Sequence, residues 1–339
     1  MTQSPEASVR IHELAYGLAL TGALLAAVRL GVAETLDGES APVEEIASTV
    51  GADPDALHQL LRALALHGVF TEVSDRVYAH TPMSRTLRQD LPGNRSGMVR
   101  LAGAPFAWRM WERLDESVRT GRSVLPGLYG KDLYDHLAED DPVSGEIFDL
   151  AMSRSSQAAS AALARTVDLS GAATVADIGG GTGTLLRSLL LAHPDLRGVL
   201  FDLPRVVARA EPDLSGDGAL ADRCEVIAGD ALVDLSVKAD VYVFKGVLHM
   251  WDDEAVVGVL RRVVAAAPFD ARVVLLEQVL DRTASRRAGA LMDLLMLVSQ
   301  GGRERTEAEF ADVLGRAGLK VRRTVPAGPT HHMIEAVLA

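Results

Sequence analysis

The chain has 339 residues, one cysteine and a net charge of −12, so it is long enough for two domains and has no intramolecular disulfide. The acidic balance argues against nucleic acid as a partner, and the lone Cys224 is typical of a reducing cytoplasm. The N-terminus lacks the basic region of a signal peptide. The apolar run from Leu14 to Leu30 is interrupted by glycine and arginine, so we expect a buried helix there and no membrane span.

Residues 8–36 predict one or two Ala/Leu-rich helices that are apolar around most of their circumference. Such helices must be buried on several sides, which favours a partner subunit. A helix-turn-helix and a hairpin follow, and together they predict a winged-helix module: Pro42–Val50, Pro54–Leu66 with Asp53 as N-cap, Val69–Val73 and Arg76–Ala79. Residues 1–100 hold eight basic and twelve acidic residues, which favours a structural or dimerising module over a DNA-binding one.

Residues 95–165 predict linking helices with a concentration of large side chains in a chain that has few aromatics. Two interpretations stay open, a ligand pocket outside the sheet domain and ordinary packing between helices. The side chains concerned are Phe106, Trp108, Trp111, Phe148 and Met152.

From residue 172 onward, apolar strands alternate with helices, a pattern that predicts an α/β domain with a parallel sheet covered on both faces. The expected strands are Thr174–Ile178, Gly198–Asp202, Cys224–Ala228, Val241–Leu248 and Val273–Val279. The expected helices include Leu185–Ala192, Val206–Arg209 and Ala255–Ala266. The chain closes with a helix Thr306–Ala317 that starts in a capping box, and with strands Lys320–Val325 and His332–Leu338 around the turn Ala327–Thr330.

The first of these strands ends in an acid and runs into spaced glycines, at Asp177, Gly179, Gly181 and Gly183. The dinucleotide fingerprint would require a glycine at 184, where the chain has threonine. The pattern is instead typical of S-adenosylmethionine (SAM) sites, in which glycines let the backbone approach the cofactor closely.

Polar residues also close the following strands, at the sheet edge where ligands bind in α/β folds. Asp177 is predicted to accept from the cofactor's ammonium, directly or through water, and Asp202 from its ribose hydroxyls. Asp230, which follows Gly229, is predicted to accept from the adenine amino group, and Lys245 to meet the carboxylate.

His249 follows the fourth strand directly, just past the sheet edge, whereas the other eight histidines have no comparable position. A phenol with a pKa near ~10 is a poor nucleophile, and an imidazole with a pKa of ~6.5 can take its proton. Such a base needs a carboxylate that fixes its tautomer, and Glu277 and Glu304 are the candidates. The alternative is a structural histidine.

With these motifs, the chain resembles the plant-type small-molecule O-methyltransferases, the caffeic-acid O-methyltransferase-like family, in its bacterial natural-product branch. The resemblance covers nearly the whole chain through the winged-helix region and the segments 177–183, 201–204, 229–230, 248–253 and 301–306. It implies a Rossmann-like class I methyltransferase domain, with a mostly parallel sheet and an antiparallel last strand, beside a mainly helical N-terminal dimerisation domain. The implied boundaries are 1–95 for dimerisation, 96–165 for a helical linker that contributes to the substrate pocket, and 166–339 for SAM binding.

The resemblance also implies a homodimer whose N-terminal helices intertwine, with a small aromatic acceptor and no metal. By motif matching it implies SAM contacts from Gly179, Asp202, Leu203, Asp230, Ala231 and Lys245, with His249 as the base between Glu277 and Glu304. Trp108 of the aromatic concentration is predicted to line the acceptor pocket, as are Phe148, Met152, Met292 and Met296 by family position.

One residue departs from the family pattern, since Met250 stands where an acid or amide commonly follows the catalytic histidine. That change argues against a catechol acceptor. The leading hypothesis is methyl transfer to a hydroxyl of an aromatic secondary metabolite, such as a polyketide, an anthracycline-like compound or an aryl acid. The alternatives are a SAM-binding hydroxylase or decarboxylase, an N-methyltransferase, and a SAM-responsive winged-helix regulator.

Overall fold

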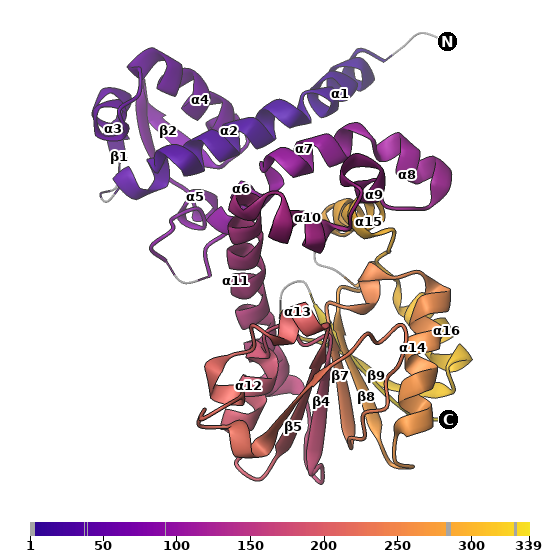
Figure 1. Cartoon of the computed structure of the whole chain (residues 1–339). Coiled ribbons are helices and arrows are strands. Elements are labelled where there is room, and N and C mark those ends of the chain that lie inside the picture. The colour runs from indigo at the N-terminus through magenta and orange to yellow at the C-terminus, as the bar shows by residue number, and fades with distance from the viewer. Residues whose placement is uncertain (1–3, 37, 39, 92, 283–285, 329–330) are drawn as a thin grey trace. The chain divides into compact units, whose positions relative to one another are not determined.

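The computed structural model describes residues 4–339 except 37, 39, 92, 283–285 and 329–330, and it describes the backbone alone at 153–159 and 162. The chain forms two compact units (Figure 1). The first comprises Met1–Glu112 and Leu137–Arg154, and the second comprises Arg113–His136 and Ser155–Ala339.

The first unit contains the predicted winged helix, with α3 (Val43–Val50) and α4 (Pro54–Leu66) beside a three-stranded sheet. The sheet order is β1 (Ser40–Pro42), β3 (Val77–His80) and β2 (Phe70–Ser74), all antiparallel. The Asp53 carboxylate accepts from the amides of Asp55 and Ala56 at 3.0 and 2.9 Å, so the predicted N-cap starts α4. The leucine stripe of α4 packs into the core of this module.

The N-terminal helices α1 (Pro5–Ala15) and α2 (Gly17–Leu30) leave much of their apolar surface uncovered by this chain. Apolar side chains that are 60–68% exposed include Val9, Ile11, Leu14 and Leu18. No single helix among the described residues is long and apolar enough to cross a membrane, and only α1 and α2 together, bent by 45°, meet that test on length and composition. The predicted burial of these helices therefore requires something beyond this chain.

The rest of the first unit is helical: α5 (Pro82–Arg85), α6 (Ser96–Ala102), α7 (Pro105–Glu112), the end of α10 (Leu133–Glu139) and the first half of α11 (Pro142–Thr166). Phe106 and Met110 of α7 are buried. The Trp108 indole donates to the carbonyl of Gly103 at 3.0 Å. This part of the aromatic concentration thus serves local packing, whatever else it does.

The second unit is built on a seven-stranded sheet of order β6-β5-β4-β7-β8-β10-β9. Five strands are parallel and β10 runs antiparallel to both of its neighbours, which confirms the predicted sheet. The strands are β4 (Thr174–Ile178), β5 (Arg197–Asp202), β6 (Cys224–Ala228), β7 (Val241–Lys245), β8 (Arg272–Glu277), β9 (Leu319–Pro326) and β10 (His332–Leu338).

Helices cover both faces of this sheet (Figure 1). One face packs on α14 (Asp253–Ala266) and α16 (Glu307–Arg316), and the other packs on α12 (Thr184–Ala192). Four further helices of the unit are α8 (Leu114–Thr120), α9 (Leu125–Tyr129), α13 (Pro204–Val207) and α15 (Arg286–Gln300). It also contains the 3-10 turns η2 (Pro212–Leu214), η3 (Ala221–Arg223) and η4 (Leu248–Met250). The remaining 3-10 turn, η1 (Val32–Thr35), lies in the first unit.

Several predicted bounds shift for identifiable reasons. The fourth strand ends at Lys245 and not at Leu248, because Gly246 has a φ of +61° that breaks the extended chain before η4. The helix expected at Val206–Arg209 begins earlier, at Pro204, because proline is well placed at the first helical position. The capping box of Thr306 with Glu309 is present as predicted. The last two residues of the predicted turn Ala327–Thr330 lie outside the described residues.

Candidate active site

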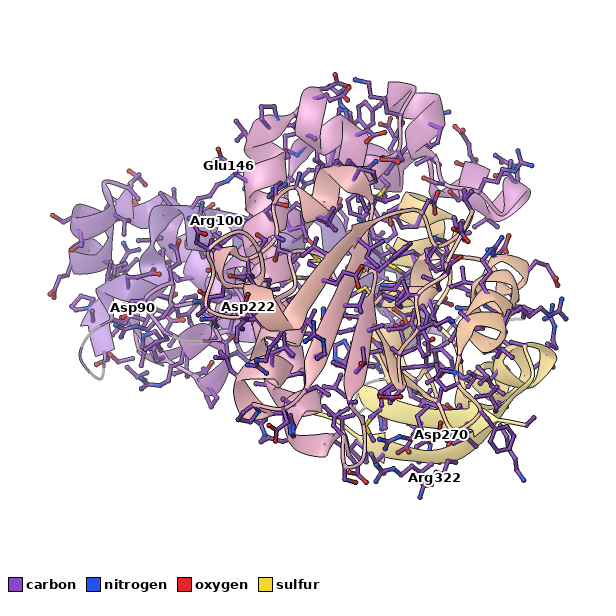
Figure 2. The ribbon with its side chains drawn as sticks, turned by 60° about the horizontal axis from the view of Figure 1, so that its bottom comes forward. Asp90, Arg100, Glu146, Asp222, Asp270 and Arg322 are labelled. Atoms are coloured by element: carbon purple, nitrogen blue, oxygen red, sulfur yellow. The ribbon has the colours of Figure 1, made fainter. Side chains whose placement is uncertain are left out.

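Buried charge marks the carboxyl edge of the large sheet. Most charged side chains reach the surface, as Asp270 and Arg322 do (Figure 2). Within the described chain, the buried Asp, Glu, Lys and Arg side chains are Asp177, Glu277, Glu304, Arg305 and Glu335. Glu335 is paired with arginines, including Arg323 at 2.6 Å. The other four belong to the segments that form the site, where burial of charge needs a functional or structural reason.

The glycine loop after β4 has the backbone that the sequence predicts. Gly179, Gly181 and Gly183 have φ values of +67°, +63° and +88°, which residues other than glycine rarely adopt. A Cβ on Gly179 would lie 2.7 Å from the Val247 side chain, and one on Gly183 would lie 2.3 Å from that of Leu214. Gly181 faces open space, so this backbone can be approached by a ligand.

The carboxylate of Asp177 lies inside the protein. The side chain is 0% exposed, and neither carboxylate oxygen forms a hydrogen bond of regular geometry among the described residues, although the Leu186 amide interacts with the group and lowers its pKa. Burial raises the pKa of Asp177 to about 6, although the charge of Lys245 acts in the opposite direction. A buried carboxylate with so little hydrogen bonding, next to an open glycine loop, fits a nearby cationic group such as the ammonium of SAM.

Asp202 closes β5 and braces the glycine loop. One carboxylate oxygen accepts from the Gly181 amide at 2.8 Å, and the other accepts from the Leu203 amide at 2.7 Å. Burial raises the pKa of Asp202, while these two amides lower it. Each oxygen keeps acceptor capacity, which fits the predicted contact with ribose hydroxyls.

The third strand end combines a close backbone approach with an acid. A Cβ on Gly229 would lie 2.6 Å from the Phe201 ring, so only glycine fits there. Asp230 accepts from the Leu232 amide at 2.9 Å, and Ala231 is buried. A cavity of about 310 Å³ is lined in part by Gly229 and Asp230.

His249, Glu277 and Glu304 come together although they are far apart in the sequence. His249 Nδ1 lies 3.0 Å from Glu304 Oε1 and 3.7 Å from Glu277 Oε2. Glu277 is fixed by the amides of Val247 and Leu248, which donate to its Oε1 at 3.0 and 2.9 Å. Because two carboxylates face Nδ1, they favour the tautomer protonated there and leave Nε2 able to accept a proton.

The electrostatics of this cluster are dominated by its acids. Burial lowers the pKa of His249, but Glu277 and Glu304 together raise it by more than burial lowers it, so the pKa lies above its ordinary value. Burial raises the pKa of Glu277. The three side chains offer ligand-type atoms within 4.8 Å of one another, a spacing that a cation can also bridge. The predicted absence of a metal therefore stays a prediction.

The predicted acceptor residues are divided between the units. Met292 and Met296 lie half-buried on α15 of the second unit, and Asp293 between them accepts from the Glu304 amide at 2.8 Å. Trp108, Phe148 and Met152 lie in the first unit, each half-buried. Their role in an acceptor pocket stays a prediction.

Two residues of the site were missed by the sequence analysis. His331 lies next to His332, which pairs with Glu277 across β10 and β8, and its ring interacts electrostatically with Glu304, His249 and Lys245. The expectation that no other histidine holds a comparable position is therefore wrong. Tyr134 donates its hydroxyl hydrogen to the Met250 sulfur at 3.1 Å, from a segment more than a hundred residues away. No local sequence pattern predicts that either residue belongs to the site.

Two family models match the chain. One is described as an O-methyltransferase domain and matches residues 111–320. The other is described as an O-methyltransferase dimerisation domain and matches residues 12–90.

Known relatives and structures agree with these matches. A mitomycin biosynthesis 6-O-methyltransferase of Streptomyces lavendulae is 39% identical over 94% of this chain and 90% of its own. An 8-amino-8-demethylriboflavin N,N-dimethyltransferase of Streptomyces davaonensis is 34% identical over 98% and 97%. Two solved structures are also similar. The calicheamicin biosynthesis methyltransferase in its SAH-bound form has a TM-score of 0.86 at 32% identity, with both chains fully covered. The neocarzinostatin O-methyltransferase with SAM and a hydroxynaphthoic acid has a TM-score of 0.74 at 33% identity, over 95% and 96%.

Proposed function

Since the chain belongs to the family of SAM-dependent O-methyltransferases with an N-terminal dimerisation domain, we propose that it methylates a hydroxyl of an aromatic natural product with His249 as general base. The observation that carries this proposal is the contact of His249 Nδ1 with Glu304 and Glu277, in the unit that also holds the glycine loop and Asp177.

In the proposed mechanism, the protein binds SAM and the acceptor, aligns them with each other and removes the proton from the acceptor hydroxyl. Bound SAM supplies an electrophilic methyl group on a positively charged sulfur. The glycine loop, Asp177 and Asp202 hold this cofactor together with Asp230 and Lys245. Glu304 and Glu277 hold His249 so that its Nε2 takes the acceptor's hydroxyl proton, which contributes roughly 10²–10⁴ in rate. The remaining acceleration comes from alignment of the two reactants.

The proposed acceptor is an aromatic hydroxyl compound of the polyketide, anthracycline-like or aryl-acid type. The neocarzinostatin relative binds a hydroxynaphthoic acid, which supports this class. Met292 and Met296 of the second unit are proposed to contact the acceptor through apolar, adaptable side chains. The contacts of Trp108, Phe148 and Met152, which lie in the first unit, stay predictions. We propose that two copies of the chain associate through α1 and α2, that no metal takes part, and that the enzyme is cytoplasmic.

A screen followed by one substitution tests the proposal. Aromatic hydroxyl compounds are incubated with SAM and the protein, and the products are examined by mass spectrometry for the gain of one CH₂. With an acceptor in hand, His249→Gln should lower kcat by roughly 10²–10⁴ and leave SAM affinity within about twofold in calorimetry. Exposed His67 provides the control, since His67→Gln removes an imidazole without changing turnover. Turnover that survives in His249→Gln would refute the proposed base, and turnover lost in EDTA would refute the metal-free mechanism.

N-methylation is the second candidate, because a relative of 34% identity is named as an N,N-dimethyltransferase. Fragmentation of the product separates methyl on nitrogen from methyl on oxygen. Gain of an oxygen atom, or loss of CO₂, would indicate the hydroxylase or decarboxylase alternative. A SAM-dependent gel shift at low salt would support the regulator.

A further inference from the structure

A fully buried arginine clamps the turn that carries His249. Arg305 is 0% exposed. Its guanidinium donates to the Leu248 carbonyl at 2.9 Å, to the Trp251 carbonyl at 2.8 Å and to Asp253 Oδ1 at 2.9 Å. The two carbonyls lie on either side of His249 and Met250, so one side chain holds both ends of the short turn η4.

The segment that carries Arg305 touches the same turn with its backbone. The Arg303 amide donates to the His249 carbonyl at 2.9 Å. A Cβ on Gly302 would lie 2.1 Å from that carbonyl oxygen, so no other residue allows this approach. Glu304 of the same segment meets His249 Nδ1. Four consecutive residues therefore fix the backbone and the ring of His249 together.

Arg305 also brings a positive charge to an acidic cluster. The charged or titratable groups that face His249 are Glu277 from β8, Glu304 and Arg305 from the segment after α15, and His331 from the turn before β10. Burial has the largest single effect on the pKa of His249 and lowers it, as does the Arg305 charge, whereas the two glutamates raise it. Asp253, at the start of α14, forms an ion pair with Arg305 at 2.7 Å and so reduces the charge that His249 experiences.

We propose that Arg305 is a positioning residue of this active site, which holds the His249 turn in place and whose positive charge, reduced by the ion pair with Asp253, offsets part of the negative charge of the two glutamates. This inference rests on the proposed function, because it assigns Arg305 to the support of His249 as the base. A base whose pKa is raised too far stays protonated near neutral pH and cannot accept a proton. Arg305 limits that rise.

The test measures the His249 titration directly, by NMR on protein with ¹³C-labelled histidine, with His249→Gln to assign the signal. Arg305→Met removes the positive charge and should raise the His249 pKa by about one unit. Asp253→Asn leaves Arg305 less neutralised and should lower it by about half a unit. The acid limb of kcat/KM should move by the same amounts in the same directions. Because the titration needs no acceptor and no turnover, it is independent of whether His249 is the base.

Two further variants separate position from charge. Arg305→Lys keeps the charge but cannot reach three acceptors at once, so kcat should fall by roughly tenfold while the His249 pKa moves little. Arg223→Met is the matched control, since Arg223 also donates to three carbonyls, of Leu190, His193 and Leu196, but at the opposite edge of the sheet. It should lower stability and leave the pKa and the acid limb unchanged.

Opposite shifts in Arg305→Met and Asp253→Asn support the inference, whereas equal shifts or none overturn it. Unchanged kcat in Arg305→Lys overturns the positioning role. Should Arg305→Met fail to fold, a lowered His249 pKa in Asp253→Asn together with a reduced kcat in Arg305→Lys supports the inference, and the absence of either effect overturns it.

Discussion

The substitution Asp177→Asn tests the buried carboxylate of the proposed cofactor site. Asp177 has a pKa of about 6 in the folded protein because it is buried, against an ordinary 3.8. An acid with a raised pKa binds its proton more tightly in the folded state, so this group reduces stability as pH rises through the window from about 4 to 6. The full difference of about two units corresponds to roughly 3 kcal/mol.

Part of this pH-dependent stability difference falls between pH 5 and pH 8, where unfolding can be measured. When the pH rises from 5 to 8, ionisation of this carboxylate should lower the free energy of unfolding of the wild-type protein by about 1–2 kcal/mol. Asp177→Asn should not show this loss. Urea unfolding of both proteins at these two pH values measures the change, and Asp222→Asn, at an exposed position (Figure 2), is the control. A stability difference between wild type and Asp177→Asn that is the same at pH 5 and pH 8 would show that the carboxylate is not desolvated as described.

The same variant should behave in the opposite way toward the cofactor. At pH 8 the ionised carboxylate attracts the cationic ammonium, so Asp177→Asn should bind SAM more weakly, by roughly tenfold to a hundredfold. In wild-type protein near pH 6, SAM binding should release protons, which calorimetry in buffers of different ionisation enthalpy detects. Undiminished SAM affinity in the variant would remove Asp177 from the cofactor site.

The remaining predictions concern the surface of α1 and the second histidine of the site. Ile11→Glu places a charge on an apolar residue that is 68% exposed, and it should convert the proposed dimer to monomer in analytical ultracentrifugation, whereas Phe269→Glu, at 94% exposure, should not. His331 has a pKa lowered to about 4 by burial, with the Lys245 and His249 charges acting in the same direction, so it is uncharged at neutral pH. His331→Gln should therefore leave the acid limb of the pH–rate profile in place, and a limb that disappears would make His331 the titrating group.

Local pattern was sufficient where local forces decide the structure. The strands Thr174–Ile178 and Cys224–Ala228 have the predicted bounds because apolar runs and flanking turns define them. Asp53 and Thr306 cap their helices as predicted, since capping depends on a few neighbouring residues. The approach of His249 to Glu277 also followed from strand order, because parallel strands end at one edge, whereas Glu304 comes from the segment after α15 and not from a strand end.

Long-range pairing explains what the sequence did not reveal. His331 reaches the site because β10 runs antiparallel beside β8, which sets His332 opposite Glu277. The register of such a pair depends on residues more than fifty positions apart. The contact of Tyr134 with Met250 depends on how α9 and α10 fold onto the sheet unit, which no periodicity encodes. The role of Arg305 likewise emerges only when its segment meets η4.

The path of the chain between the two units limits how the gene can be divided. Residues 113–136 belong with the sheet unit, although residues 137–154 return to the other one. Within the sheet unit, Ser123 donates to the Ser299 carbonyl at 2.8 Å and Arg205 pairs with Asp135 at 3.1 Å. A polypeptide that starts after residue 165 would lack both contacts, because Ser123 and Asp135 would be missing. Exchanging acceptor specificity between relatives by a single crossover would therefore mix the two parents within one folded unit.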